Sequence, residues 1–259
     1  MWNWQTATVT AIEQLNSTTR RFCLTVNDTD CFDFRAGQFV TFDLPISEKR
    51  LQRWRSYSIA SAADGTPNFE LCIVQLQGGA GTRFFFETVE IGTVLTFKGA
   101  DGAFVLPETI ETDVTMICTG TGIAPFRAML QHIFNNNIPH KKLHLIFGTR
   151  YKTDILYVDE WRDLAEKHPE FSFSVALSRE YLLQEDSLQE GFISFYKGYV
   201  HRVYNANLQK NDVKNDTAND TLNTMRYFIC GWQAMIDETR KNLQAANIPT
   251  SQIHYELYG

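Results

Sequence analysis

The sequence predicts a two-domain α+β protein, with an antiparallel β-barrel over residues 1–107 followed by an α/β domain with a parallel sheet over residues 108–259. Three observations support this fold class. Short strand-like runs at close spacing fill the first hundred residues, whereas strand and helix patterns alternate after Pro107. The composition, 44% hydrophobic and 21% charged, is that of an ordinary globular chain with enough length for a buried core.

The first domain contains six runs rich in β-branched and aromatic residues, separated by turn-forming pairs such as Asn27-Asp28 and Asp64-Gly65. Many short strands at regular spacing favour a barrel or a sandwich, and one helical segment, 82–89, interrupts them. The expected strands are 8–12, 21–26, 38–44, 56–60, 69–75 and 93–98.

The second domain begins after a boundary near 106–112. Alternating strand and helix patterns predict a parallel sheet with helices on both faces. We expect residues 209–223, QKNDVKNDTANDTLN, to form a mobile polar loop, because they have too little apolar surface to offset the entropy of ordering. The expected strands are 114–118, 143–147, 171–177 and 227–230, and the expected helices are 126–134, 158–168 and 234–246.

Composition excludes several classes of protein. A net charge of −6 argues against a general affinity for nucleic acid, which needs clustered Lys and Arg. An acidic protein partner would need a local basic patch, for which Lys49, Arg50, Arg53 and Arg55 are candidates. The five cysteines lack the spacing of zinc or iron–sulfur ligands, and no signal peptide or membrane span is evident. We therefore expect a cytoplasmic protein without a metal site.

Glycine-rich turns mark two candidate phosphate sites. Gly120 and Gly122 follow a strand, and Pro125 suits the first turn of the next helix, where its missing N–H costs little. Such glycines let the backbone approach a pyrophosphate at the positive end of a helix. A second turn, Gly78-Gly79-Ala80-Gly81-Thr82, also leads into a helix.

The run Arg55-Ser56-Tyr57-Ser58 opens a strand of the first domain. Arg binds phosphate with two parallel hydrogen bonds, and Tyr57 lies on the same strand face and offers a ring for stacking. Taken alone, the run is equally compatible with an ordinary barrel strand that carries one solvated Arg.

These motifs, in this order, resemble the ferredoxin–NADP reductase family, in particular its bacterial-type ferredoxin and flavodoxin reductases. The resemblance extends from about Val9 to the C-terminus and implies an FAD-binding barrel followed by a Rossmann-like NADP-binding domain. It implies that Arg55 and Thr82 bind the phosphates of FAD, that Tyr57 lies against the flavin ring and that Ser58 lies near N5. The remaining flavin contacts that it implies come from Ser56, Cys72, Ile73, Val74, Gly79 and Gly81.

For the nucleotide, the resemblance implies that Gly120, Gly122 and Pro125 bind the pyrophosphate. Thr121 and the pair Cys230-Gly231 would border the nicotinamide. Taken from the residues alone, Cys230 is equally compatible with a small hydrophobe at a strand end.

At the C-terminus, Glu256 would orient the nicotinamide amide or relay a proton, and Tyr258 would cover the flavin. Plastid-type members end at that Tyr, whereas this chain adds Gly259, which leaves Tyr255 as an alternative for the stacking role.

Cofactor choice depends on recognition of the 2′-phosphate of NADP. The resemblance places Ser178, Arg179, Lys197 and Tyr199 there, and Arg150 is a further candidate. This set favours NADPH over NADH. Two carboxylates close by, Glu180 and Glu185, act against that preference, and NADH remains an alternative.

The implied activity is hydride transfer between nicotinamide C4 and flavin N5, followed by single-electron transfer to ferredoxin or flavodoxin. Because no four-Cys cluster is present, we expect the electron acceptor to be a separate protein or a diffusible acceptor. The alternatives are an NAD(P)H:flavin reductase, an NADH-dependent reductase component of an oxygenase, a non-catalytic flavin-binding sensor or subunit, and a nucleotide-binding module without flavin.

Overall fold

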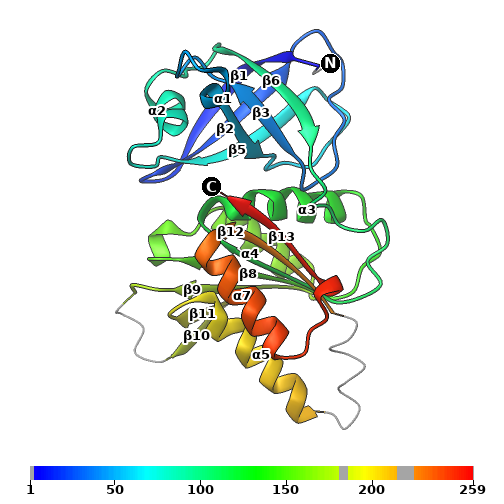
Figure 1. The fold of residues 1–259 in the computed structure, drawn as a ribbon. Helices are drawn as coiled ribbons and strands as arrows, with labels where there is room; N and C mark the ends of the chain where they lie inside the picture. The colour runs from blue at the N-terminus through cyan, green and yellow to red at the C-terminus, as the bar shows by residue number, and fades with distance from the viewer. Residues whose placement is uncertain (1–2, 181–185, 215–224, 259) are drawn as a thin grey trace. The chain divides into compact units, whose positions relative to one another are not determined.

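The computed structural model describes residues 3–180, 186–214 and 225–258, and of residues 209–214 and 258 it describes the backbone alone. The chain divides into two compact units (Figure 1). One comprises Met1–Leu106 and Ala124–Asn137, and the other comprises Pro107–Ile123 and Ile138–Gly259. The helix α3 (Ala124–Asn135) therefore belongs with the first unit, although it follows the first strand of the second.

The first unit is an antiparallel six-stranded barrel, as the sequence predicts. Its strand order is β4-β3-β6-β1-β2-β5, and an isolated bridge between Ile59 and Leu71 links the two outer strands. Two shorter helices, α1 (Arg50–Arg53) and α2 (Ala80–Glu87), lie between strands in the chain. The strands are β1 (Gln5–Asn16), β2 (Thr19–Val26), β3 (Phe39–Asp43), β4 (Trp54–Ser58), β5 (Asn68–Val74) and β6 (Val94–Asp101).

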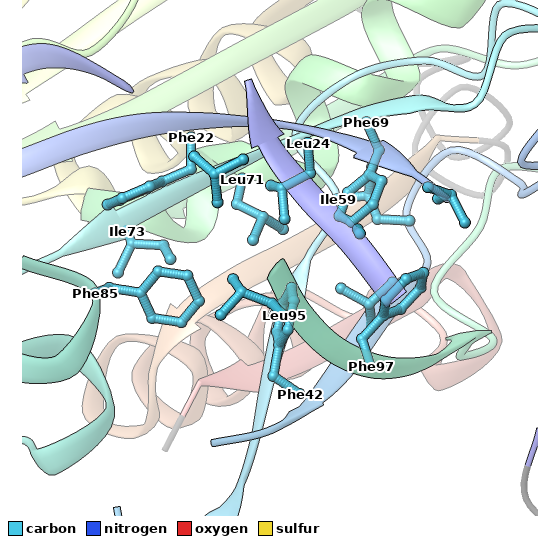
Figure 2. Packing of buried hydrophobic residues seen from close by; sticks show 14 of the residues in the cluster. Phe22, Leu24, Phe42, Ile59, Phe69, Leu71, Ile73, Phe85, Leu95 and Phe97 are labelled. Atoms are coloured by element: carbon cyan, nitrogen blue, oxygen red, sulfur yellow. The ribbon is translucent and has the colours of Figure 1, made fainter. Parts of the chain in front are cut away.

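Aromatic and aliphatic side chains together fill the barrel (Figure 2). The rings of Phe22 and Phe42 meet the ring of Phe85 edge-on, with centroids 5.2 and 5.6 Å apart, and Phe97 packs on Phe42 at 5.9 Å. Edge-on contacts of this kind add to the stability gained from burial alone. The high phenylalanine content is therefore used largely in the core, and Phe85 holds α2 against the strands.

The second unit contains a seven-stranded sheet in the order β10-β11-β9-β8-β7-β12-β13, in which only β10 runs antiparallel to its neighbour. The strands are β7 (Val114–Thr119), β8 (Leu143–Thr149), β9 (Phe171–Leu177), β10 (Ser187–Glu190), β11 (Ile193–Lys197), β12 (Arg226–Trp232) and β13 (Ile253–Tyr258). The helices are η1 (Gly120–Ile123), η2 (Lys152–Asp154), α4 (Val158–Lys167), α5 (Val200–Lys214), α7 (Gln233–Ala245) and η3 (Thr250–Gln252).

Helices cover both faces of this sheet, as the alternating pattern predicts. Trp161 of α4 packs on Phe173 of β9, with ring centroids 5.9 Å apart. Ala176, three residues further along β9, points to the opposite face and joins a cluster that includes Val203 of α5 and Ile236 of α7. None of the helices that the structure describes is long and apolar enough to cross a membrane.

The expected polar loop over 209–223 is wrong in its first part, because residues 209–214 continue α5. The first half of α5 is anchored in the core by Val203, Tyr204 and Leu208, and extending a formed helix costs far less than starting one. Residues 215–223 of that expectation lie outside the described residues. The sequence reading also omitted α5 itself, β10, β11 and β13.

Candidate flavin and nucleotide sites

Three elements of the candidate flavin site converge in the barrel unit. Arg55 and Tyr57 lie on β4, and Gly81 lies in the first turn of α2. A Cβ atom at Gly81 would lie 2.8 Å from Cγ of Arg55 and 3.2 Å from the hydroxyl of Tyr57. Only glycine therefore lets the helix start approach both side chains.

Both side chains have donors suited to an anion. The Arg55 guanidinium donates to the carbonyl oxygens of Gln52 and Trp54, at 3.0 and 2.7 Å, through Nη1. Burial raises the pKa of Tyr57 well above its ordinary value, although the charge of Arg55 acts in the other direction. The phenol is therefore protonated at physiological pH and able to donate a hydrogen bond.

The glycine-rich turn leaves the start of α2 open. Gly78 has φ +78°, a conformation that favours glycine, and no side chain caps the helix. The Thr82 hydroxyl accepts from the N–H of Leu76 at 3.1 Å and lies 3.2 Å from the carbonyl of Gly79, so it builds the turn. A phosphate at this end would therefore meet the free N–H groups of the first turn.

A surface cavity of about 300 Å³ lies beside this turn. It is lined by residues 75–79 with Arg83 and Glu87 of α2. Sequence reasoning did not select Arg83, although a cation directly after a glycine-rich turn is a recognisable signal for phosphate binding.

The other expected flavin contacts occupy the place where the barrel closes. Ser58 precedes Ile59 and Cys72 follows Leu71, the two residues of the closing bridge. Ser58, Cys72 and Ile73 are buried, and Val74 is half-buried. Ser56 points elsewhere, because its hydroxyl lies 2.9 Å from that of Thr41 on β3. The structure therefore groups Ser58 with Cys72, and separates the Ser56 side chain from Arg55 and Tyr57.

In the sheet unit, the expected nucleotide turn packs directly on the end of β12. Gly120 and Gly122 lie in η1, which runs into Pro125 at the start of α3. A Cβ atom at Gly122 would lie 2.4 Å from the carbonyl oxygen of Cys230 and 3.0 Å from Cα of Gly231. Gly231 has φ +148°, so glycine is favoured on both sides of this contact.

This contact lies at a switch point of the sheet. In the sheet, β8 and β9 lie on one side of β7, whereas β12 and β13, which come later in the chain, lie on its other side. In open α/β sheets, ligands bind at the carboxyl ends of the strands at such a point. The candidate residues that lie within the last residues of these strands, or just beyond them, are Thr121, Arg150, Ser178, Arg179, Lys197, Tyr199, Cys230, Gly231 and Glu256.

Hydrogen bonds between backbones hold the loops after β8 and β9 together. The N–H of Arg179 donates to the carbonyl of Arg150 at 3.0 Å, and both side chains are exposed. Lys197 and Tyr199 are also exposed at the end of β11. The Ser178 hydroxyl donates to the carbonyl of Thr149 at 3.2 Å, so it must rotate before it can donate to a phosphate.

The acidic residues near this cluster are engaged elsewhere. The Glu180 carboxylate accepts from the N–H of Lys152 at 3.3 Å, and Glu190 forms an ion pair with the Lys152 ammonium. Asp186 pairs with Arg202 at 3.2 Å. Glu185, which the sequence also places nearby, lies outside the described residues.

The C-terminal strand brings two expected residues together. Cys230 on β12 is the register partner of Glu256 on β13. The Cys230 side chain is fully buried, and Glu256 is half-buried. The backbone of Tyr258 pairs with Trp232, but the Tyr258 side chain and Gly259 lie outside the described residues.

Sequence reasoning missed Thr119 and Gly148. The Thr119 hydroxyl is buried and has no hydrogen-bond partner among the described residues, and a Cβ at Gly231 would lie 2.6 Å from it. A Cβ at Gly148 would lie 2.9 Å from the Thr119 methyl carbon. The sequence does contain a signal for these two residues, because two neighbouring strands end on similar pairs, Thr119-Gly120 and Gly148-Thr149.

Known proteins share this arrangement. Residues 6–106 match an oxidoreductase FAD-binding domain, and residues 116–241 match an oxidoreductase NAD-binding domain. A ferredoxin–NADP reductase B from Sorangium cellulosum is 28% identical, over 97% of this chain and 96% of its own length. The toluate 1,2-dioxygenase electron transfer component of Pseudomonas putida is also 28% identical, over 97% of this chain but 67% of its own length.

Solved structures agree with the fold. A cytochrome P450 reductase from Amycolatopsis superposes with a TM-score of 0.80 and 25% identity, over 98% of this chain and 69% of that one. A ferredoxin–NADP reductase from Neisseria gonorrhoeae with bound FAD and NADP superposes with a TM-score of 0.75 and 22% identity, over 98% of both chains.

The fold and the two domain matches define a flavoprotein oxidoreductase of the electron-transfer class, with an FAD-binding barrel and an NAD(P)-binding sheet. More particularly, the chain belongs to the ferredoxin–NADP reductase family.

Proposed function

We propose that the protein is an FAD-dependent reductase that transfers electrons between NADPH and a separate one-electron carrier, ferredoxin or flavodoxin. The observation that carries the proposal is the contact of Gly81 with Arg55 and Tyr57, because it joins a cation, a protonated phenol and an open helix start in one place.

These residues fit the pyrophosphate of FAD. Two phosphates carry charge that the Arg55 guanidinium and the N–H groups of the first turn of α2 neutralise. Arg83, on the wall of the neighbouring cavity, adds a second cation. Bound FAD supplies a group that accepts two electrons as hydride and releases them one at a time.

The protein's own part is alignment and exclusion of water. Ser58 and Cys72 are nearly inaccessible to solvent, at 5% and 6% exposure, so a ring bound there would lie at a dry wall. The Ser58 hydroxyl is able to donate a hydrogen bond to a ring nitrogen. Tyr57 would support the ring from the side of β4.

On the nucleotide side, the packing of Gly122 on Cys230 leaves room for a backbone approach but not for a side chain. We assign the pyrophosphate to Gly120 and Gly122 with the start of α3. Glu256 would accept a hydrogen bond from the carboxamide and so fix which face of the nicotinamide is presented. Cys230 would support that group through its backbone, since its side chain is buried.

A preference for NADPH is supported by charge. Among the residues that the structure describes, Arg150, Arg179 and Lys197 form no ion pair, whereas the nearby Lys152 and Arg202 do. Three exposed cations that pair with no carboxylate in the described part of the chain suit a dianionic 2′-phosphate, and Tyr199 offers a ring for the adenine. NADH would use the same site without that contribution.

An acidic carrier is supported by a basic surface on the barrel unit. Lys49, Arg50 and Leu51 are exposed, and the Arg50 guanidinium lies 5.1 Å from the ring of Trp54. Such a patch on a chain of net charge −6 would steer an acidic protein to this surface.

A second candidate is the reductase component of an oxygenase. Relatives named as electron transfer or reductase components of toluate dioxygenase and propane monooxygenase support it, and the chain spans 67% and 60% of their lengths. This candidate differs from the first in the acceptor rather than in the chemistry of the flavin.

The experiment is a set of anaerobic turnover assays with the purified protein and NADPH or NADH. The acceptors are ferredoxin, flavodoxin, an oxygenase component and free FAD. Fast reduction of ferredoxin or flavodoxin with NADPH supports the proposal, and preference for an oxygenase component supports the second candidate. Turnover of free FAD by a colourless protein would indicate a flavin reductase, and bound flavin without turnover would indicate a sensor.

A further inference from the structure

One arginine is buried in the barrel unit and serves neither proposed binding site. Arg127 lies in α3 and is 3% exposed. Its Nη1 donates to the carbonyl oxygen of Ala60 at 2.7 Å and to the carboxylate of Glu70 at 2.6 Å. A buried guanidinium is strongly unfavourable unless it is paired and hydrogen-bonded, so these two contacts help to hold α3 on the barrel.

The partners of Arg127 lie close in the chain to the proposed flavin contacts, with Ala60 just beyond β4 and Glu70 in β5. Ala60 is two residues beyond Ser58, and Glu70 is two residues before Cys72. A second hydrogen bond, from the N–H of Ala62 to Oε1 of Gln131 at 3.1 Å, fixes the next turn of α3 to the same segment. Phe126 also packs on Phe104, with ring centroids 5.8 Å apart.

The other end of α3 is continuous with the nucleotide turn. η1 ends at Ile123 and α3 begins at Ala124, so no linker separates them, and Arg127 lies in the first turn of the helix. Arg127 therefore lies four residues beyond Ile123, the last residue of the nucleotide turn, with continuous helical backbone between them.

We propose that Arg127 is a positioning residue for hydride transfer: through Ala60 and Glu70 it fastens the helix that follows the nucleotide turn to the strands that hold the flavin. This inference rests on the proposed function. A buried ion pair contributes little net stability compared with apolar packing. Its hydrogen bonds are directional, however, so it is better suited to orienting a helix on a sheet than to stabilising the fold.

The chain offers a matched control. Glu70 also lies 3.8 Å from Nη1 of Arg21, which forms an ion pair with Glu13. Arg21 therefore contacts the same carboxylate, but it joins barrel strands to one another and does not contact α3 through any of these pairs. Loss of Arg21 perturbs the charge balance of Glu70 without releasing the helix.

The experiment compares Arg127→Met, Arg127→Lys and Arg21→Met with the wild-type holoenzyme. Stopped-flow reduction at saturating NADPH gives the hydride-transfer rate, and difference spectra give the nucleotide Kd. We expect Arg127→Met to lower the rate about 10- to 100-fold, as a displacement near 1 Å does, while FAD content and Kd stay within about threefold. Because Lys keeps a donor for both oxygens, Arg127→Lys should restore most of the rate, and Arg21→Met should stay within about twofold of wild type.

Hydrogen exchange gives a readout that is independent of turnover. The amides of residues 126–131 should exchange faster in Arg127→Met than in wild type, whereas in Arg21→Met they should exchange at the wild-type rate. If Arg127→Met does not fold, Glu70→Gln removes the charge of the partner and keeps an acceptor. Glu70→Gln should show a smaller loss of hydride-transfer rate than Arg127→Met and the same local rise in amide hydrogen exchange.

Two results overturn the inference. One is an Arg127→Met enzyme, loaded with FAD, whose hydride-transfer rate is within about twofold of wild type. The other is an equal loss of rate in Arg21→Met, which would indicate a general effect on the barrel. A wild-type holoenzyme that neither NADPH nor NADH reduces would instead reject the proposed function, and the role of Arg127 with it.

Discussion

Replacing Gly122 with alanine tests the nucleotide turn by a change of a single methyl group. The added Cβ would lie 2.4 Å from the carbonyl oxygen of Cys230, whereas ordinary contact begins at 3.4 Å, so η1 and the end of β12 must separate by about 1.0 Å. The atoms nearest to the added Cβ belong to the backbone of Cys230 and Gly231, so no side-chain rotation relieves the contact. Gly122 has no left-handed φ, which leaves the steric clash as the main effect.

The expected effect follows from that displacement. Overpacking of this kind costs about 1–3 kcal/mol of stability, and a 1 Å misplacement of a reacting group costs about 100-fold in rate. Chemical unfolding measures the first, and stopped-flow reduction by NADPH measures the second.

Gly120 provides the control for Gly122→Ala. It lies in the same turn at φ +53°, with nothing within 4 Å of an added Cβ, and asparagine tolerates that conformation. Gly120→Asn should therefore keep the stability within about 1 kcal/mol of wild type. A Gly122→Ala protein with wild-type stability and reduction rate would refute the assignment of this contact.

Three further predictions concern other parts of the chain. Arg55→Met should weaken FAD binding about 10- to 100-fold, measured by flavin retained on dialysis, whereas Arg53→Met, which removes the partner of Asp43, should not. Arg179→Ala should raise the KM for NADPH about tenfold or more and leave the KM for NADH unchanged; an equal rise for both nucleotides would remove Arg179 from the 2′-phosphate site. Burial lowers the pKa of His144 to about 4, and its ring contacts Ser174 and Asn207. Because His144 binds a proton more readily in the unfolded chain, the protein should lose up to about 3 kcal/mol of its unfolding free energy as pH falls from about 6.5 to 4. In His144→Gln, the unfolding free energy measured with urea should depend less on pH over this range.

The fold class could be predicted because strand and helix periods differ clearly between the two halves. The elements that were missed have physical reasons. In α5 the apolar residues Val200, Val203, Tyr204 and Leu208 do have helical spacing, but they are few and a long polar run follows them, so no helix was predicted there. The strand β10 is exposed along its whole length, so it shows no alternation of buried and exposed residues.

The candidate site was predictable where backbone geometry requires glycine. Gly81, Gly122 and Gly231 each stand where a Cβ would meet another element within 3.0 Å. Side-chain roles were less accessible, because the sequence does not show that the Thr82 hydroxyl is used within its own turn or that Ser56 faces β3. The burial of Arg127 was also hidden, since its partners are 57 and 67 residues away.

The most direct test of the central claim is the visible spectrum of the purified protein before and after anaerobic addition of NADPH. The account predicts a yellow protein with FAD bound, whose flavin absorption is lost on adding NADPH and returns on adding oxidised ferredoxin or flavodoxin. A colourless protein that takes up no FAD, or a yellow one that neither NADPH nor NADH bleaches, would contradict it.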